Sequence, residues 1–314
     1  MVWGVVLAGV LVGFLREEGE TPPPQRRIAI TFDDLPAVSV LQPDTAGQRD
    51  LLLPVQKAVL AHDVPAIGFV NESKLYREDT LDPARVALLE GWLDAGLELG
   101  NHTFSHPDLH HTPLATWLAD AARGEEVTRR LLQRRGRELA WFRHPYLHTG
   151  RDLDTRRAVE ADLAERGLAV APVTVDNDDY LFAAAWDRAG ARGDAALQEK
   201  IEAAYVPYML AKVAYYEDQS RGLFDREVPL VLLLHANSIN ARRFGELAAG
   251  LAARGYRFVP LAEAVADPAY GSADTYTGPA GISWLHRWAL TRGVEPSFFA
   301  GEPDVPQWLA AAAR

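Results

Sequence analysis

The 314-residue sequence contains no cysteine and only two methionines. The absence of cysteine excludes disulfides, thiolate nucleophiles, iron–sulfur clusters and cysteine-built zinc sites. Long basic runs are also absent, and 43 acidic against 32 basic residues give a net charge of −11. Neutralisation of phosphates dominates binding to nucleic acid, so we expect no nucleic-acid partner. An acidic protein also suits a neutral substrate better than a polyanion.

An almost unbroken apolar stretch occupies residues 2–15, followed by a proline-rich stretch over 21–25. The apolar stretch is shorter than the roughly 20 residues needed to span a bilayer and is typical of a secretory signal or short anchor. We therefore expect residues 1–26 to be a signal-like or anchor segment with a linker, and the protein to be exported or attached to the cell envelope. Membrane contact would be made only through residues 2–15, if they stay uncleaved. No Lys or Arg precedes the stretch, which leaves a buried N-terminal element, a misassigned start and a cytoplasmic location as alternatives.

Apolar, β-prone runs alternate with helix-length segments from residue 27 to residue 267. Asp82-Pro83 and Gly96 mark the start and end of one such helix, and a single long helix is expected over 114–135. The alternation predicts an α/β fold with a mainly parallel sheet. Seven units favour a closed or nearly closed (β/α)7 barrel, with an open doubly wound sheet as the alternative. The seven expected strands are 28–32, 66–70, 97–101, 139–142, 168–175, 230–234 and 257–260.

Two segments fall outside this alternation. Residues 176–229 form an oversized insertion that is rich in tyrosine. We expect a packed helical excursion there, with an aromatic wall beside the site as the alternative. Residues 268–314 are rich in glycine, proline and tryptophan and are expected to form a C-terminal extension that packs on the barrel, which itself occupies residues 27–267.

Polar clusters follow six of the expected strands, at the point where each strand ends. Because the loops at the carboxyl ends of parallel strands converge in a barrel, we expect these clusters to build one site. An adjacent aspartate pair, Asp33-Asp34, and the spacing of His102 and His106 together offer two imidazoles and a carboxylate. This donor set suits Zn²⁺ or another first-row divalent ion. The neighbouring pair His110-His111 is expected to lie exposed on a loop.

Five short motifs carry a family resemblance. They are Thr31–Asp34, His102–His106, Arg143–Tyr146, Asp176–Tyr180 and Leu232–His235, in that order. With these motifs, residues 27–267 resemble the polysaccharide deacetylases of the NodB-homology type, carbohydrate esterase family 4. The resemblance implies a distorted (β/α) barrel, in agreement with the seven units.

The resemblance also implies a metal site and a base. Asp34, His102 and His106 would hold one divalent metal ion, with Zn²⁺ expected first and Co²⁺ or another first-row metal as alternatives. Asp33 would be the general base, and Arg143 would pair with it and orient it.

The remaining implied roles concern the acid, the oxyanion and the acetyl group. His235 would be the general acid, supported by an acid of the fourth motif, for which Asp176 is chosen among three competing aspartates. Tyr146 would offer its backbone N–H to the oxyanion. Leu232 and Leu234 would form the apolar pocket for the acetyl group.

Two loop residues are further candidates for substrate binding. His148 follows the third motif, and Asn237 follows the fifth. Both are polar, and both are expected to lie on loops beside the site.

The expected activity is metal-dependent hydrolysis of carbon–nitrogen, non-peptide bonds. The substrate would be an acetylated, N-acetylglucosamine-containing glycan, either chitin-like or peptidoglycan, and the product would be acetate. The alternatives are O-acetyl xylan, a small non-carbohydrate amide, and a catalytically silent glycan-binding barrel. A metal-dependent phosphoesterase fits the net charge less well.

Overall fold

The computed structural model describes residues 1, 26–41 and 43–314. The apolar stretch at 2–15 and the proline-rich stretch at 21–25 lie outside the described residues. In the described part of the chain, no helix combines the length and apolar character that a membrane crossing requires.

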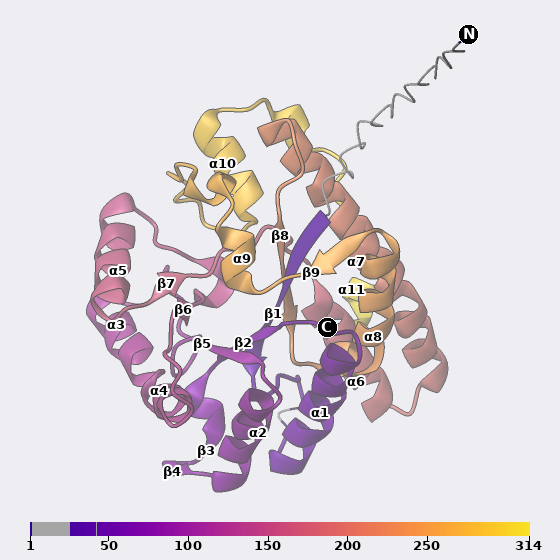
Figure 1. The fold of residues 1–314 in the computed structure, drawn as a ribbon. Coiled ribbons are helices and arrows are strands. Elements are labelled where there is room, and N and C mark those ends of the chain that lie inside the picture. Colours follow the sequence, from indigo (N-terminus) through magenta and orange to yellow (C-terminus); the bar gives the residue numbers. More distant parts are fainter. Residues whose placement is uncertain (2–25, 42) are drawn as a thin grey trace.

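One curled sheet of parallel strands forms the centre of the molecule (Figure 1). Its order is β7-β6-β5-β2-β1-β8, and β9 pairs with the beginning of β1. The bounds are β1 Arg26–Leu35, β2 Ile67–Val70, β5 Glu98–Asn101, β6 Trp141–Phe142, β7 Ala169–Val170, β8 Leu230–His235 and β9 Tyr256–Phe258. Seven strands therefore lie close to the seven expected positions.

The segment after β7 brings the two ends of the sheet together. Val175 forms a parallel bridge with Leu232 of β8, and the Thr174 N–H donates to the Val231 carbonyl at 3.0 Å. β6 and β7 contribute only two residues each. The expected distorted (β/α) barrel is confirmed.

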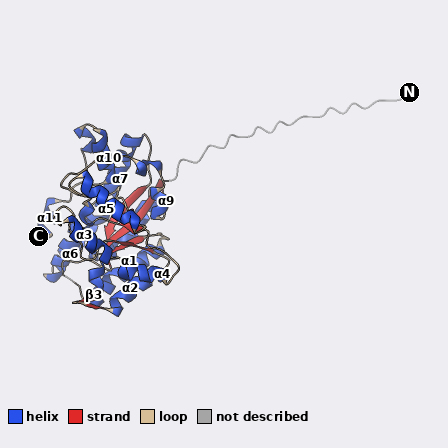
Figure 2. Ribbon diagram, turned by 90° about the vertical axis from the view of Figure 1, so that its left-hand side faces the viewer, coloured by secondary structure: helices blue, strands red, loops and turns tan. Residues whose placement is uncertain are grey.

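Helices cover the outer face of the sheet (Figure 2). Asp82 caps α2 by accepting a hydrogen bond from the Ala84 N–H, and Pro83 is its first residue, so the expected helix start is confirmed. The first eight α-helices in chain order are α1 Thr45–Ala61, α2 Pro83–Asp94, α3 Leu114–Arg123, α4 Glu126–Gln133, α5 Leu153–Glu165, α6 Asp179–Ala191, α7 Ala195–Phe224 and α8 Ser238–Ala253. The remaining elements are the hairpin β3 Tyr76–Arg77 with β4 Thr80–Leu81, and the helices α9 Leu261–Val265, α10 Trp284–Arg292 and α11 Gln307–Ala312.

The single long helix expected over 114–135 is wrong, because the chain breaks between α3 and α4. A Cβ placed on Gly124 would lie 2.2 Å from the carbonyl carbon of Thr103, so the chain passes too close for a side chain. The carboxylate of buried Glu72 accepts hydrogen bonds from the N–H groups of Val127 and Thr128, at 3.0 and 2.7 Å. These N–H groups lie in the first turn of α4, where no helical carbonyl can pair with them. The break thus gives α4 its own capped start.

The insertion and the tail both pack on the barrel. α6 and α7 fill most of the insertion, and the four tyrosines of α7, Tyr205, Tyr208, Tyr215 and Tyr216, are buried. These four are packing positions, as expected of a helical excursion, whereas Tyr180, the fifth tyrosine of the insertion, is exposed and lines the cavity described below. In the tail, the Trp284 N–H donates to the Val173 carbonyl at 2.7 Å, which fixes α10 beside the segment that closes the barrel.

Candidate active site

A cavity of about 840 Å³ opens at the carboxyl ends of the strands. The polar clusters expected at this edge meet there, as the geometry of a parallel barrel requires. The lining residues that carry chemistry are Asp33, Asp34, His102, His106, Tyr146, His148, Asp176 and His235.

Asp33 and Arg143 form a buried ion pair beneath this cavity. One Arg143 nitrogen, Nη1, lies 3.2 Å from each carboxylate oxygen of Asp33. The guanidinium is wholly buried, donates to Thr31 Oγ1 at 3.2 Å and the Ala171 carbonyl at 3.0 Å, and covers the Phe69 ring. Burial raises the pKa of Asp33, while the charge of Arg143 opposes that rise. This pairing agrees with the expected roles of base and orienting residue.

Asp34, His102 and His106 come together as the sequence predicts. One ligand atom from each residue lies within 4.8 Å of the others. His102 Nδ1 is 2.8 Å from the Arg143 carbonyl, and a carbonyl only accepts, so Nδ1 carries the proton and Nε2 is free as a ligand. Asp34 and His106 both have left-handed backbone, with φ of 70° and 60°, a conformation held at a cost by the surrounding structure.

The three side chains are in the protonation states that a metal requires. Burial lowers the pKa values of His102 and His106 to about 4, so both imidazoles are neutral at pH 7. Burial works against ionisation of Asp34, but nearby positive charge, that of Lys74 foremost, outweighs it and lowers the pKa of this carboxyl well below its usual range. The residues therefore fit a divalent ion of the zinc type, with room for further ligands.

Lys74 is a further residue of the site, and no motif in the sequence identifies it. Its Nζ lies 3.3 Å from Asp34 Oδ1 and donates to the Asp34 carbonyl at 3.0 Å. The only sequence signal is its place shortly after Asn71-Glu72, a polar pair that directly follows the expected strand 66–70.

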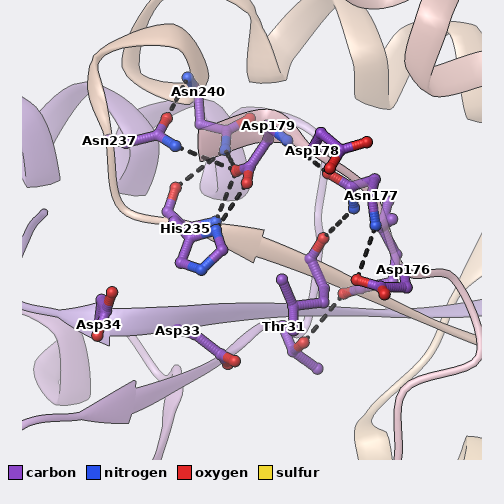
Figure 3. Close-up of polar contacts among 12 residues, drawn as sticks. Thr31, Asp33, Asp34, Asp176, Asn177, Asp178, Asp179, His235, Asn237 and Asn240 are labelled. Carbon is purple, nitrogen blue, oxygen red and sulfur yellow. Dashed lines mark hydrogen bonds and ion pairs between the residues drawn. The ribbon is translucent and has the colours of Figure 1, made fainter. Parts of the chain in front are cut away.

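His235 is held by Asp179 and not by Asp176, so the predicted support from Asp176 is wrong. Asp179 Oδ1 lies 2.6 Å from His235 Nδ1, and Oδ2 accepts from the His235 backbone N–H at 2.9 Å. Asn240 Nδ2 donates to the same Oδ2 at 2.7 Å, as Figure 3 shows. Burial disfavours the charged imidazole, but Asp179 outweighs it and raises the pKa of His235 to about 9.

Asp176 lies elsewhere in the same cavity, away from the His235 ring (Figure 3). Its Oδ1 accepts from the Asn177 N–H at 2.9 Å. Burial raises its pKa to about 7, against the nearby charge of Lys212. Asp179 stands at the first position of α6, and this placement, which depends on the tertiary fold, decides which of the three aspartates reaches the histidine.

Leu232 and Leu234 do not line the cavity, and Leu233 does. Successive side chains of a strand point to opposite faces, so residues 233 and 235 share the inner face. Leu232 and Leu234 are fully buried in the packing around the sheet. The prediction that Leu232 and Leu234 form the acetyl pocket is therefore wrong, because the side chain that faces the cavity is that of Leu233, one residue away.

Asn237 is not available to a substrate either. Its side chain is 1 % exposed, its Nδ2 donates to Asp179 Oδ2 at 3.1 Å, and its Oδ1 accepts from the Asn240 N–H at 3.0 Å. Asn237 thus caps α8 and orients Asp179, so the prediction that it binds substrate is wrong.

Tyr146 and His148 do reach the cavity. Tyr146 is 56 % exposed, and its ring lies 4.5 Å from the His106 ring, centroid to centroid. The backbone of Tyr146 is left-handed, with φ of 57°. Gly281 of the tail contacts the Tyr146 carbonyl so closely that a Cβ on it would lie 1.8 Å from that oxygen. The tail therefore helps to position the Tyr146 loop.

The sequence profile of the polysaccharide deacetylase family matches residues 20–164. This range contains the first three motifs, whereas the fourth and fifth follow it. No curated protein matches the sequence significantly.

Solved structures of a family 4 carbohydrate esterase pseudoenzyme share the fold. A pseudoenzyme mutant with restored enzymatic activity is 16 % identical over 77 % of this chain and 68 % of its own, with a TM-score of 0.52. The wild-type pseudoenzyme, from Bacillus anthracis, is 15 % identical over 77 % and 66 %, with a TM-score of 0.50. A peptidoglycan deacetylase from Bacillus subtilis is 20 % identical over 80 % and 96 %, with a TM-score of 0.49.

Proposed function

Because the chain carries a polysaccharide deacetylase domain of the NodB-homology type, we propose that it hydrolyses N-acetyl groups of an N-acetylglucosamine-containing glycan and releases acetate. The observation that carries this proposal is the position of a base and an acid on paired strands. Asp33 of β1 is the register partner of His235 of β8, and both line the cavity beside Asp34, His102 and His106.

Asp33 is suited to take a proton from the attacking water. Its raised pKa makes it a stronger base than an exposed carboxylate, and the Arg143 guanidinium favours its ionised form against the effect of burial. A positioned base of this kind typically contributes about 10²–10⁴-fold to the rate.

His235 is suited to give a proton to the leaving nitrogen. With a pKa of about 9 it is protonated at neutral pH, and Asp179 fixes Nδ1, so Nε2–H is the free donor. The water oxygen bonds to the acetyl carbon, the carbon–nitrogen bond breaks, and the amine leaves with the proton of His235. The products are acetate and a free amino sugar.

Asp34, His102 and His106 would hold the divalent ion, and Zn²⁺ suits their donor set best. Such an ion polarises a carbonyl and acidifies a water molecule. The backbone N–H of Tyr146 is our candidate donor to the oxyanion, and Leu233 is our candidate wall for the acetyl methyl group.

A pseudoenzyme with this fold shows that the barrel alone does not establish catalysis. The retained set of Asp33, Arg143, His235 and the three candidate ligands supports an active enzyme over a silent glycan-binding barrel. Export of the protein, which residues 2–15 lead us to expect, would bring such a glycan within its reach.

The test is acetate release from N-acetylglucosamine oligomers by the full chain, metal-stripped and then supplied with Zn²⁺ or Co²⁺. Release that is restored by metal and lost in Asp33→Asn and His102→Gln supports the proposal. Asp50→Asn, on the exposed face of α1, is the matched control and should behave as wild type. Binding of the oligomer without release of acetate would favour a catalytically silent glycan-binding barrel. Release of acetate only from acetylated xylan, or hydrolysis only of a small amide, would show that the substrate belongs to that class instead.

A further inference from the structure

A buried arginine of the tail contacts the loop that carries Tyr146. Arg287 of α10 is 1 % exposed. Its Nη2 donates to Thr149 Oγ1 at 2.6 Å, and its Nη1 lies 3.5 Å from the carbonyl oxygen of Leu147. The guanidinium thus bridges two residues that follow Tyr146 closely in the chain.

The guanidinium of Arg287 is held from its other side by the tail itself. Its Nε donates to Asp274 Oδ2 at 2.8 Å, and its central carbon lies 4.3 Å from the centroid of the Trp284 ring. Asp274 is in turn fixed to the barrel, because Arg156 of α5 donates to its backbone carbonyl at 2.7 Å. A buried charge is costly unless it is paired and hydrogen-bonded. Asp274 and the acceptors on the loop together therefore keep the guanidinium in one place.

The loop that Arg287 contacts has an unfavourable backbone conformation. Tyr146 and Leu147 are both left-handed, with φ of 57° and 55°. Residues with a side chain adopt this conformation at a cost, and it persists only where the surrounding structure holds it. Gly281 packs against the Tyr146 carbonyl, and Arg287 contacts the carbonyl of the next residue. Two groups of the tail thus hold consecutive carbonyls of this turn.

The tail also covers the loop that follows His106. The Pro279 carbonyl lies beside the His110 ring, and His110 is only 8 % exposed. The prediction that His110 and His111 both lie exposed is therefore wrong for His110. Its ring stacks on that of His148, with centroids 3.9 Å apart, so this contact of the tail also reaches the Tyr146 loop.

We propose that Arg287 is a positioning residue for the oxyanion donor. Through Leu147 and Thr149 it would hold the backbone N–H of Tyr146 in the orientation that the reaction requires. This role rests on the proposed function, in which that N–H donates to the oxyanion. A donor that is already in place needs no reorganisation when the charge develops, and this makes it effective. Loss of Arg287 would release the loop and leave the base, the acid and the three candidate metal ligands in place.

The experiment measures acetate release from N-acetylglucosamine oligomers by the full chain supplied with Zn²⁺. In Arg287→Met, kcat should fall about 10²-fold, as for a displaced positioning group. KM should change little, because the oxyanion forms only in the transition state. Thr149→Val removes the hydroxyl that Arg287 contacts and should lower kcat in the same direction by a smaller factor. Arg292→Met is the matched control and should keep the wild-type kcat. Arg292 lies on the same helix, and its guanidinium attaches the tail to the Leu223 carbonyl of α7 and to Ser272 Oγ.

Amide hydrogen exchange of the chain without added metal gives a second readout that needs no activity. The N–H groups of Leu147 and His148 donate to the carbonyls of His144 and Pro145, each at 3.1 Å. These amides are protected only while the loop keeps its shape. Their exchange should become faster in Arg287→Met and stay as in the wild type in Arg292→Met. Circular dichroism at the assay temperature shows whether each variant is folded.

A folded Arg287→Met with wild-type kcat and wild-type exchange would overturn the proposal. Equal losses in Arg287→Met and Arg292→Met would also overturn it, because any loosening of the tail would then suffice. If Arg287→Met does not fold, the same two measurements on Thr149→Val decide. If the wild type releases no acetate, the proposed function fails by itself, and the exchange rates alone show whether Arg287 positions the loop.

Discussion

The carboxylate of Asp179 lies 2.6 Å from Nδ1 of His235 and also accepts the backbone N–H of the same residue. It thereby fixes the ring orientation and the position of its proton. The pKa of His235 is raised to about 9 from an ordinary value of 6.5. A raised pKa stabilises the folded protein below about pH 6.5, and this stabilisation is lost as the pH rises through about 9.

Activity should therefore fall as the pH rises through about 9, because His235, the proposed general acid, loses its proton. In Asp179→Asn the alkaline limb of the pH–rate profile should move to lower pH, since burial alone lowers the pKa of an imidazole. The rate at pH 8 should fall about 10²-fold or more. The matched control is Asp176→Asn, three residues earlier in the same motif, which should leave the alkaline limb in place. An equal shift in both variants would contradict the assignment.

Removal of Arg143 should affect both stability and the acidic limb. Arg143→Met leaves the buried Asp33 carboxylate without its partner, which typically costs about 3–5 kcal/mol of unfolding free energy. The pKa of Asp33 should rise further, so the acidic limb of the pH–rate profile should move to higher pH. Urea denaturation and a pH series measure the two effects. The double variant Asp33→Asn/Arg143→Met should recover part of the lost stability, and failure to recover any would argue that packing of Arg143 on Phe69 dominates.

Substitution of Leu233 should change the preference for the acyl group, whereas substitution of Leu232 should change only the stability of the fold. Leu233→Ala enlarges the cavity, so the ratio of activity on N-propionyl over N-acetyl substrates should increase severalfold. Leu232→Ala should leave that ratio unchanged and lower the unfolding free energy by about 2–5 kcal/mol, as expected for a core deletion. The ratio of kcat/KM for the two acyl groups, measured with thermal unfolding, tests this. An altered ratio in Leu232→Ala would restore the pocket first expected from the sequence.

Gly281→Ala, a substitution in the C-terminal extension, should lower activity by displacing the loop that carries Tyr146. A Cβ there would overlap the Tyr146 carbonyl oxygen, so the Tyr146 loop must move, and a displaced positioning group can cost about 10²-fold in rate. Gly271→Ala is the matched control, because a Cβ at that position meets no atom within 4 Å. Steady-state kinetics of the two variants measures whether the tail positions the Tyr146 loop. Near-wild-type activity of Gly281→Ala would show that it does not.

The barrel could be predicted because its signals are local. Apolar runs, the Asp82-Pro83 helix start and the polar residues at strand ends can all be recognised within a few positions. The break between α3 and α4 could not, because the carboxylate that caps α4 comes from Glu72, more than 50 residues earlier.

The sequence predicts those contacts of the site that follow from the spacing of residues along the chain. It does not predict the contacts that depend on how distant segments pack together. Asp34, His102 and His106 meet as expected, and so do Asp33 and Arg143. Asp179, and not Asp176, contacts His235 because of where α6 begins. A sequence with three aspartates in four positions does not reveal that starting point. Leu233 was within reach of the sequence, because strand alternation places it on the same face as His235.

The register pairing of Asp33 with His235 joins positions roughly 200 residues apart in the sequence. During synthesis on the ribosome, a nascent chain displays Asp33, both candidate histidine ligands and Arg143 long before His235 emerges. Such a chain has its proposed base but not its proposed acid, and β1 still lacks β8, the neighbour that closes the barrel. Appearance of activity would therefore report completion of the whole barrel, and not the folding of its first half.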